Sequence, residues 1–320
     1  MFRRQIVFLD AHTNNPGDLS FELLQNLGDF AVYDRTSLEQ LGARTSAAEI
    51  IIVNKFPVNK HTLALMPNVK FICVAATGFN NIEIAAVAKR DIQVSNVKGY
   101  SKDSVAQHVF ACILAITNRP EYYSHQVTQG RWSSSSDFCF YDHTIFELAH
   151  KIMGIYGYGT IGKKVGEIAH SFGMEVLSIV RDLKRERPDY VSFVDHDTLI
   201  SSSDIISLHC PLTNETHGMI NLENLRKMKS TAIVINTGRG GLVNENDLLH
   251  ALDHGLIGGA ILDVLQVEPP KVGNQLIGHP KCLITPHQAW ASKESRQRLL
   301  EGVAQNIISY LNGQWINRVY

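Results

Sequence analysis

Three side chains suited to anion binding and proton transfer lie in the last third of the chain. Arg239 belongs to the segment NTGRGGLVNE, Glu268 to LDVLQVEPP and His287 to TPHQAWAS. An arginine can bind a carboxylate through two parallel hydrogen bonds, and a histidine exchanges protons near neutral pH. A glutamate beside the histidine would raise its basicity and orient its ring. Together the three side chains indicate acid–base chemistry on a substrate that carries a carboxylate.

The elements before these segments place them at one edge of a sheet. Short apolar runs at 231–236, 258–262 and 282–285 predict strands that end where the three segments begin. Open α/β sheets bind their ligands outside the carboxyl ends of parallel strands. Each residue alone also has an ordinary explanation as a loop or turn residue. Their convergence on one edge favours a common site.

A glycine-rich stretch, GIYGYGTIG at 154–162, begins inside another predicted strand, 152–156, and continues past its end. Gly157 would make a tight turn, Gly159 would let the backbone approach a pyrophosphate, and Gly162 would let the next helix pack on the sheet. That helix continues over 163–172, so its N-terminal N–H groups are available to the phosphates. The pattern alone is weak, but a strand before it and a helix after it favour a dinucleotide site.

The carboxylate that usually ends the second strand of such a site, and binds the adenosine ribose, is absent from its expected position. The predicted strand at 175–180 ends in Val180, and Arg181 and Asp182 follow. Arg181 could face a 2′-phosphate, Asp182 could reach back to a free ribose, or the segment could be a solvated turn. The expected cofactor is therefore NAD(H) or NADP(H), with the preference open.

Apolar runs and helical patterns alternate along the whole chain. In the first hundred residues, strands are expected at 5–9, 29–33, 49–53, 70–75 and 92–94, with helical patterns at 19–27 and 82–89. A helical segment at 102–129 leads to a second series of strands, which includes 152–156, 175–180, 191–194 and 204–208. So many short strands with crossovers predict an α/β protein with two doubly wound parallel sheets.

The chain length and the position of the last helical pattern predict the domain organisation. At 320 residues the chain exceeds the size at which a single hydrophobic core keeps growing. The helical pattern from about Ser292 onward should return to the first domain. We expect a flavodoxin-like substrate-binding domain at 1–101 and 292–320, a Rossmann nucleotide-binding domain at 102–291, and an active site in the cleft between them.

Charge and cysteine content narrow the class of partner. Lysines and arginines number 30 against 31 aspartates and glutamates, a net charge of −1, so no basic surface is expected to attract nucleic acid or an anionic membrane. The five cysteines are scattered and form no C-x-x-C or His/Cys cluster, which argues against disulfides and a metal site. The apolar run near the N-terminus is short and predicts a strand instead of a signal sequence. We expect a cytoplasmic protein with a small-molecule substrate.

Five segments, GIYGYGTIG, LHCPLTNETHGMIN, INTGRGGLVNE, LDVLQVEPP and TPHQAWAS, resemble in order and spacing the D-isomer-specific 2-hydroxyacid dehydrogenase family. The resemblance covers essentially the whole chain. It implies that Arg239 binds the substrate carboxylate and polarises the keto oxygen, that His287 exchanges the proton, and that Glu268 is its partner. Within the family, AATGFNNIEI, VAQHVFA and SSDFCFYDHTIFELAHK look most similar to glycerate dehydrogenases, also called hydroxypyruvate reductases. One departure is His150, which stands where a glycine is usual.

The resemblance also implies the remaining binding residues. The substrate would contact Ala76, Thr77 and Gly78 of the first domain as well as Arg239 and His287. Asp263 would meet the nicotinamide carboxamide. The full set expected to contact the cofactor is Val105, Gly157, Tyr158, Gly159, Thr160, Ile161, Gly162, Val180, Arg181, Asp182, His209, Cys210, Pro211, Thr216, Thr237, Gly238, Arg239, Asp263, His287 and Ala289.

The implied reaction is hydride transfer between NAD(P)H and C2 of a small 2-keto acid, with hydroxypyruvate and D-glycerate as the expected pair. Glyoxylate, pyruvate or another 2-keto acid are alternatives, because selectivity rests on a few contacts. An NAD(H)-sensing protein, similar to the corepressors that share this fold, is an alternative of another class. The apolar segment at 102–129 and the aromatic loop at 138–141 match the family's dimer-forming region, so a homodimer is expected.

Overall fold

The computed structural model describes residues 4–180 and 186–320. The chain divides into two compact units. The first unit comprises the described residues up to Ser101 together with Ala291–Tyr320, and the second unit comprises Lys102–Trp290. The C-terminal segment therefore belongs to the first unit. The boundary after Trp290 lies one residue before the position expected from the sequence.

The first unit contains a five-stranded parallel sheet in the order β2-β1-β3-β4-β5. Its strands are β1 (Gln5–Phe8), β2 (Asp29–Val32), β3 (Ala48–Val53), β4 (Phe71–Val74) and β5 (Gln93–Asn96). The central strands are rich in β-branched residues and buried on both faces, as is typical of a parallel sheet. The strand order reverses between β1 and β3, which is where a flavodoxin-like sheet binds its ligand.

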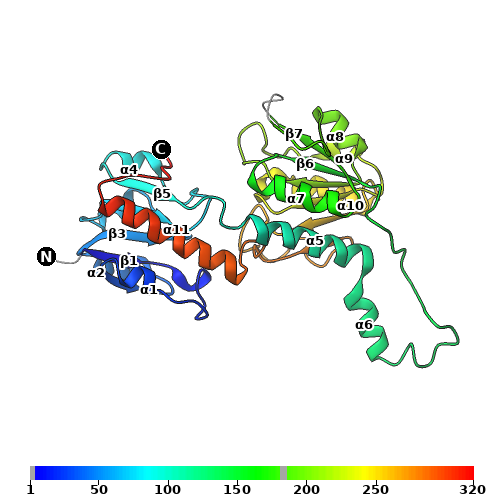
Figure 1. The fold of residues 1–320 in the computed structure, drawn as a ribbon, viewed down its shortest axis with the longest axis horizontal. Helices are drawn as coiled ribbons and strands as arrows, with labels where there is room; N and C mark the ends of the chain where they lie inside the picture. The colour runs from blue at the N-terminus through cyan, green and yellow to red at the C-terminus, as the bar shows by residue number, and fades with distance from the viewer. Residues whose placement is uncertain (1–3, 181–185) are drawn as a thin grey trace. The chain divides into compact units, whose positions relative to one another are not determined.

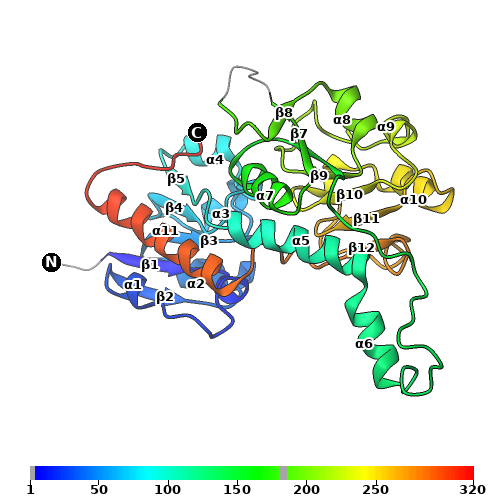
Figure 2. The same cartoon turned by 45° about the vertical axis from the view of Figure 1, so that its right-hand side comes forward.

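Helices cover both faces of this sheet (Figure 1). They are α1 (Glu22–Gln25), α2 (Leu38–Thr45), α3 (Lys60–Ala64), α4 (Ile84–Ala88) and α11 (Lys293–Leu311). α11 begins after Ser292, whose hydroxyl oxygen accepts the Ser295 amide at 3.2 Å. It runs along one face of the sheet and contacts β4 (Figure 2). α1 and α4 are shorter than the helical patterns in the sequence predict.

The second unit contains a seven-stranded parallel sheet in the order β12-β11-β10-β9-β6-β7-β8. Its strands are β6 (Ile152–Tyr156), β7 (Glu175–Ile179), β8 (Val191–Phe193), β9 (Ile205–Leu208), β10 (Ile233–Asn236), β11 (Gly259–Leu262) and β12 (Cys282–Ile284). The order reverses between β6 and β9, as it does in dinucleotide-binding folds. The predicted pair of doubly wound parallel sheets is therefore confirmed.

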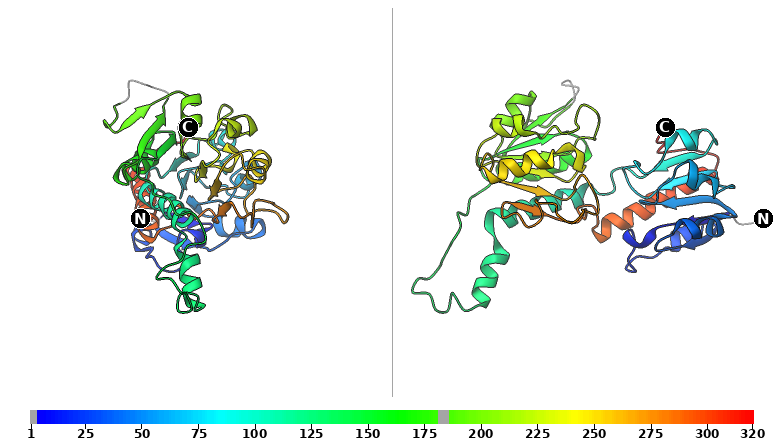
Figure 3. Two further views of the ribbon diagram at one scale, coloured as in Figure 1. Left: turned by 90° about the vertical axis from the view of Figure 1, so that its right-hand side faces the viewer. Right: turned by 180° about the vertical axis from the view of Figure 1, so that it is seen from behind.

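Two hydrophobic layers enclose the second sheet. On one face lie α5 (Lys102–Asn118) and α7 (Thr160–Ser171), which pack on each other. The other face is covered by α8 (His196–Ser202), α9 (Leu222–Lys227) and α10 (Glu245–Asp253). Figure 3 shows α10 on the face that is turned away in Figure 1. None of the described helices is long and apolar enough to cross a membrane.

The helix predicted over 102–129 is interrupted, which corrects the prediction. α5 ends at Asn118, and α6 spans Pro120–Thr128. A continuous helix cannot pass through Pro120, because proline has no amide hydrogen to donate and its ring clashes with the carbonyl one turn earlier. Arg119 between them has a left-handed φ of 49°. α6 and the loop that follows it extend away from the sheet of the second unit (Figures 1 and 3).

His150, the departure from the family pattern before β6, has a left-handed backbone with φ of 63°. Glycine adopts this conformation without steric cost, which explains why it is usual at this position. The His150 amide donates a hydrogen bond to the Gly173 carbonyl at 2.9 Å. The histidine is therefore accommodated in a backbone conformation suited to glycine.

Candidate active site at the carboxyl edge of the second sheet

Glu268 and His287 form the central contact of the candidate site. Glu268 lies in the loop after β11, and His287 lies in the loop after β12. Nδ1 of His287 and Oε2 of Glu268 are 2.6 Å apart, while Oε1 of Glu268 accepts the Leu265 amide at 3.0 Å. Both side chains are partly exposed. Because Nδ1 is engaged by the carboxylate, Nε2 is the ring nitrogen that can exchange a proton with a substrate.

The buried carboxylate of Asp263 holds the turn that carries His287. Asp263 is 1% exposed. Its Oδ1 accepts the Thr285 hydroxyl at 2.7 Å and the Gln288 amide at 2.9 Å, and its Oδ2 accepts the Ala289 amide at 2.9 Å. Three donors compensate the burial of one negative charge. The two amides fix the backbone after His287 and the Thr285 hydroxyl ties the side before it, which makes Asp263 a positioning residue.

The backbone of His287 itself is held in an uncommon conformation. Its φ is 51°, in the left-handed region. Such a conformation costs a non-glycine residue about 1–3 kcal/mol and persists only where the surroundings enforce it. The His287 amide donates to the carbonyls of Asp263 at 2.8 Å and Thr285 at 3.0 Å, and the Trp290 indole donates to the His287 carbonyl at 2.9 Å. These bonds offset the strain and set the direction of the ring.

His108 of α5 extends this network, and no role was assigned to it from the sequence. The Thr285 hydroxyl donates to Asp263, so its lone pair accepts the His108 Nε2–H at 3.0 Å. Nε2 of His108 also lies 3.7 Å from Oδ1 of Asp263 and 3.5 Å from Sγ of Cys112. The sequence signal was weak: His108 stands one helical turn after Val105, a predicted cofactor residue.

Arg239 follows β10 in a loop that touches the loop of Glu268. A Cβ on Gly240 would lie 2.0 Å from the carbonyl carbon of Leu265, so only glycine allows this contact. The Arg239 guanidinium donates to the Gly238 carbonyl at 2.7 Å. The structure thus brings the loops of all three predicted acid–base and anion-binding residues to adjacent strand ends, with the direct side-chain contact between Glu268 and His287.

The three glycines after β6 have different structural roles. Gly157 has a φ of 101°, and a Cβ there would lie 2.8 Å from the Cys210 amide. A Cβ on Gly162 would lie 2.2 Å from the Gly157 carbonyl oxygen, so α7 can approach the turn only without a side chain. Gly159 differs, because no atom lies within 4 Å of the position of its Cβ. The turn therefore leaves open space directly before α7.

The residues at this edge fit a dinucleotide. The open space at Gly159 precedes α7, a 12-residue helix whose first N–H groups suit a phosphate. Oγ1 of Thr237, a predicted cofactor contact after β10, is buried and has no hydrogen-bond partner among the described residues. An orphaned buried hydroxyl is costly unless a ligand or water satisfies it. Both features lie at strand ends next to the reversal between β6 and β9.

Two predicted cofactor residues already use their side chains within the second unit. Tyr158 is 2% exposed, and its ring packs edge-on against Phe193 in the core, so only its backbone faces the glycine turn. The Thr216 hydroxyl is used within its own loop. It accepts the Thr213 amide at 2.8 Å and donates to the Pro211 carbonyl at 2.7 Å. These residues shape the loops around the predicted site.

The remaining predicted cofactor residues lie mostly in or against the core. Val105 and Ala289 are buried, while Ile161 and Val180 pack against the same hydrophobic cluster as α5 and α7. Cys210 is half-buried, and burial raises the pKa of its thiol to about 11. Thr160 is the first residue of α7. Arg181 and Asp182 lie outside the described residues, so their part in the choice of cofactor stays a prediction.

The predicted substrate loop of the first unit follows β4. Ala76 is buried, and Thr77 is exposed, with its hydroxyl donating to the Val97 carbonyl at 2.9 Å. Among the described residues, no acceptor is hydrogen-bonded to the amides of Thr77 or Gly78. Two successive amides without partners can bind a carboxylate, because they present adjacent donors.

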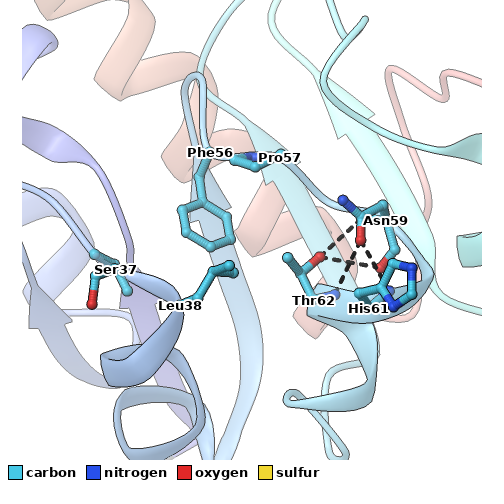
Figure 4. A pocket seen from close by; sticks show the side chains of 8 residues that line it. Ser37, Leu38, Phe56, Pro57, Asn59, His61 and Thr62 are labelled. Atoms are coloured by element: carbon cyan, nitrogen blue, oxygen red, sulfur yellow. Dashed lines mark hydrogen bonds between the residues drawn. The ribbon is translucent and has the colours of Figure 1, made fainter.

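The first unit also has a cavity between α2 and the loop after β3 (Figure 4). Leu38, Phe56 and Pro57 give it a mainly apolar lining. The Asn59 side chain accepts the amides of His61 at 2.9 Å and Thr62 at 3.1 Å, so it caps α3 (Figure 4). Its acceptor therefore serves the helix. The lining of the cavity belongs to the first unit, whereas the Glu268–His287 pair belongs to the second.

His209, a predicted cofactor residue after β9, has its Nε2 within 2.8 Å of the Ser207 hydroxyl. Burial lowers the pKa of His209 to about 4, from an ordinary value of 6.5. The unfolded chain therefore binds a proton between these values that the folded chain does not. The stability contributed by neutral His209 is complete above pH 6.5 and is lost as the pH falls toward 4.

We expect the free energy of unfolding to fall by at most about 3 kcal/mol between pH 7 and pH 4.5 from this group. Urea unfolding at several pH values measures the effect. His209→Gln should reduce the acid-induced loss, whereas His61→Gln, a change at an exposed histidine, should not. Equal acid sensitivity in His209→Gln and the unmodified protein would show that another group is responsible.

Comparison with known proteins places this geometry in a family. The model of the D-isomer-specific 2-hydroxyacid dehydrogenase NAD-binding domain matches residues 110–289. The chain is 41% identical to a hydroxypyruvate reductase of Blautia hydrogenotrophica, with 98% of this chain and 99% of that protein covered. It is 38% identical to a glycerate dehydrogenase of Methylorubrum extorquens, with 97% of each covered.

A solved structure supports the fold. An acyclic imino acid reductase in complex with NADPH and D-Arg matches with a TM-score of 0.85 and 30% identity, over 99% of this chain and all of that one. The matched family domain contains the glycine turn and the loops of Arg239, Glu268 and His287. The chain belongs to the D-isomer-specific 2-hydroxyacid dehydrogenase family, whose members are NAD(P)-dependent oxidoreductases acting on CH–OH groups.

Proposed function

We propose that the protein interconverts hydroxypyruvate and D-glycerate, with NADH or NADPH as the hydride donor for reduction. The observation that carries the proposal is the 2.6 Å contact between Glu268 and His287 at the edge that also holds the glycine turn. The names of the relatives with 41% and 38% identity support the substrate. A sensing protein without turnover has no need for a carboxylate–imidazole pair, so the family assignment and the pair both favour an enzyme.

His287, Glu268 and Arg239 have separate roles in the proposed reaction. The nucleotide, when bound, supplies the hydride that C2 of the keto acid receives. Protonated His287 delivers its Nε2 proton to the keto oxygen, and Glu268 stabilises the imidazolium through Nδ1. Arg239 binds the substrate carboxylate and lowers the energy of the developing negative charge. In the reverse direction neutral His287 removes the hydroxyl proton.

The first unit contributes to substrate binding in this proposal. The amides of Thr77 and Gly78 bind the carboxylate. Ala76, the residue before them, is buried in the first unit. A carboxylate bound by fixed backbone donors orients the adjacent C2 carbonyl without the entropic cost of ordering long side chains. Asp263 keeps His287 in place. A carboxylate oxygen can accept more than one hydrogen bond, so Asp263 would also accept one from the nicotinamide carboxamide.

A spectrophotometric panel tests the proposed reaction. Hydroxypyruvate, glyoxylate, pyruvate and a larger 2-keto acid are each offered with NADH and with NADPH. We expect the highest kcat/KM with hydroxypyruvate, and loss of activity by about 10²- to 10⁴-fold in His287→Ala, because general acid–base catalysis contributes this much. A higher kcat/KM with another keto acid would reassign the substrate, and turnover of none would favour the nucleotide-sensing alternative.

Glu268→Gln tests the pairing of the two residues. The substitution keeps the shape of the side chain but removes the charge that stabilises protonated His287. We expect the alkaline limb of the kcat/KM profile for reduction to move to lower pH, and oxidation of D-glycerate to lose less activity than reduction. Glu301→Gln, at an exposed position of α11, serves as the matched control. An unchanged alkaline limb in Glu268→Gln would assign the ionisation to a different group.

The protein is also proposed to act as a cytoplasmic homodimer. The arm formed by α6 and residues 129–147 exposes large apolar side chains, with Phe138 89%, Tyr141 74% and Trp132 51% exposed. The arm is nevertheless ordered internally, because Arg131 pairs with Asp142 at 2.7 Å and holds the pKa of that carboxyl well below its usual range. An ordered apolar arm that its own unit leaves uncovered suits a second copy of the chain.

Light scattering at micromolar concentration measures the assembly. We expect a mass of twice 35.7 kDa for the unmodified protein, and a shift toward the monomer in Phe138→Glu, because a charge at the centre of an apolar contact is costly to bury. Val272→Glu, at an exposed apolar position outside the arm, should leave the mass unchanged. A monomeric mass for the unmodified protein would contradict the dimer.

A further inference from the structure

The carbonyl groups of the predicted substrate loop, which follows β4, accept hydrogen bonds from other residues of the first unit. The Ala75 carbonyl accepts the Asn54 side-chain amide at 2.8 Å, and the Ala76 carbonyl accepts the Val97 amide at 3.1 Å. The Thr77 carbonyl accepts the side-chain amide of Asn96 at 2.6 Å. Three successive carbonyls therefore each have a donor within the first unit.

This arrangement determines where the amides point. In a trans peptide the C=O and the following N–H lie in one plane and point in opposite directions. The peptide that carries the Ala76 carbonyl also carries the Thr77 amide, and the peptide that carries the Thr77 carbonyl also carries the Gly78 amide. Fixing the two carbonyls toward their donors therefore directs the two amides away from them, where no described residue accepts them.

The asparagines that supply the donors are buried. Asn54 is 3% exposed and Asn96 1% exposed, and Asn14, which is fully buried, gives the Ala75 carbonyl a second, longer bond of 3.4 Å. The side-chain oxygens of all three have no hydrogen-bond partner among the described residues. An unsatisfied buried acceptor costs about 1–3 kcal/mol. Each side chain therefore donates from its NH2 group to a loop carbonyl, while its own oxygen accepts no hydrogen bond from the described residues.

The asparagines are themselves held in place. The Asp10 carboxylate, at the end of β1, accepts the amides of Asn54 at 2.7 Å, Lys55 at 2.6 Å and Phe56 at 2.7 Å. This is the point where the strand order of the first sheet reverses. At the end of β5, the Asn96 carbonyl accepts the Asn306 side-chain amide at 2.9 Å, which links Asn96 to α11. The orientation of each donor is thus fixed by a second layer of hydrogen bonds.

We propose that Asn96 and Asn54 are positioning residues for substrate recognition. Asn96 fixes the peptide that carries the Gly78 amide and so aims this amide at the carboxylate of the 2-keto acid, while Asn54 holds the Ala75 carbonyl at the start of the same loop. The inference rests on the proposed function, because it takes the same loop as the carboxylate site. Asn96 has the larger effect, since it is the sole side chain that binds the Thr77 carbonyl in the described structure. Asn54 has the smaller effect, since Asn14 shares its acceptor.

Asn96→Asp and Asn96→Ala test the assignment. The aspartate keeps the shape but sets an oxygen against the Thr77 carbonyl, and the alanine removes the donor without adding a charge. We expect the KM for the keto acid to rise about tenfold, the cost of one hydrogen bond of about 1.4 kcal/mol. The change in kcat should be smaller, and the Kd for NADH, measured by nucleotide fluorescence, should stay constant because the glycine turn belongs to the second unit.

Binding of oxamate, an unreactive keto-acid analogue, to the NADH-loaded enzyme gives a readout that does not depend on turnover. Calorimetry should show about tenfold weaker oxamate binding in both Asn96 variants and a smaller loss in Asn54→Asp. Asn224→Asp is the matched control, because this buried asparagine of the second unit donates to the Met219 carbonyl at 2.7 Å, outside the proposed site. Its oxamate affinity should be unchanged.

The outcomes separate the inference from the proposed function. An unmodified enzyme that binds oxamate but reduces none of the keto acids contradicts the proposed function, and the Asn96 variants still decide the inference. Unchanged oxamate affinity in both Asn96 variants overturns the inference even if the enzyme is active. No oxamate binding by the unmodified protein also overturns it, as does an equal loss of NADH affinity, which would indicate general damage.

Discussion

The carboxylate of Asp263 is the constraint on which the candidate active site depends. It is almost fully buried, and it collects three donors from the turn at 285–289, so removing it would leave the turn without its anchor. His287 has a left-handed backbone within this turn. The ring can meet Glu268 only if that conformation is maintained. The acid–base contact therefore depends on a carboxylate that does not itself touch the imidazole.

The first unit uses the same physical device with different chemistry. There, the buried side-chain amides of Asn54 and Asn96 donate to carbonyls of the loop after β4. The Asp10 carboxylate in turn accepts the backbone amide of Asn54. In both units, a polar group buried at the carboxyl end of a strand converts a flexible connection into a fixed one. The energetics differ: three donors from the turn compensate the burial of Asp263, whereas the buried asparagines of the first unit leave their own oxygens without partners among the described residues.

The strands are predictable from the sequence because they depend on local apolar patterns. Apolar runs ended near Asn236, Leu262 and Ile284, and the residues that follow them carry the acid–base and anion-binding side chains. The expected helix over 102–129 overlooks the break at Pro120, although proline within a helical pattern is itself a signal. The assigned contacts with substrate and cofactor stay predictions.

The supporting network was not predictable in the same way. His108 is 177 residues from Thr285 along the chain, and Asn96 is separated from its partner Thr77 by 19 residues. Neither pair has a spacing that recurs in helices or strands, so only the fold brings them together. Asparagine in a short segment ordinarily predicts a turn or a helix cap, and this is how Asn59 is used. The bracing role of Asn96 required its burial and its partner to be known.

The two kinds of support suit the two tasks that a 2-keto acid imposes. Its carboxylate keeps the same charge throughout the reaction, so it is best held by backbone amides whose direction does not change with protonation. Its C2 oxygen gains a proton during reduction, so it requires a group that can change charge, and the Glu268–His287 pair provides one. Formate oxidation exchanges no such proton and would leave the pair without a task. An ionisable pair of this kind therefore favours a substrate whose oxygen exchanges a proton over a simpler carboxylate.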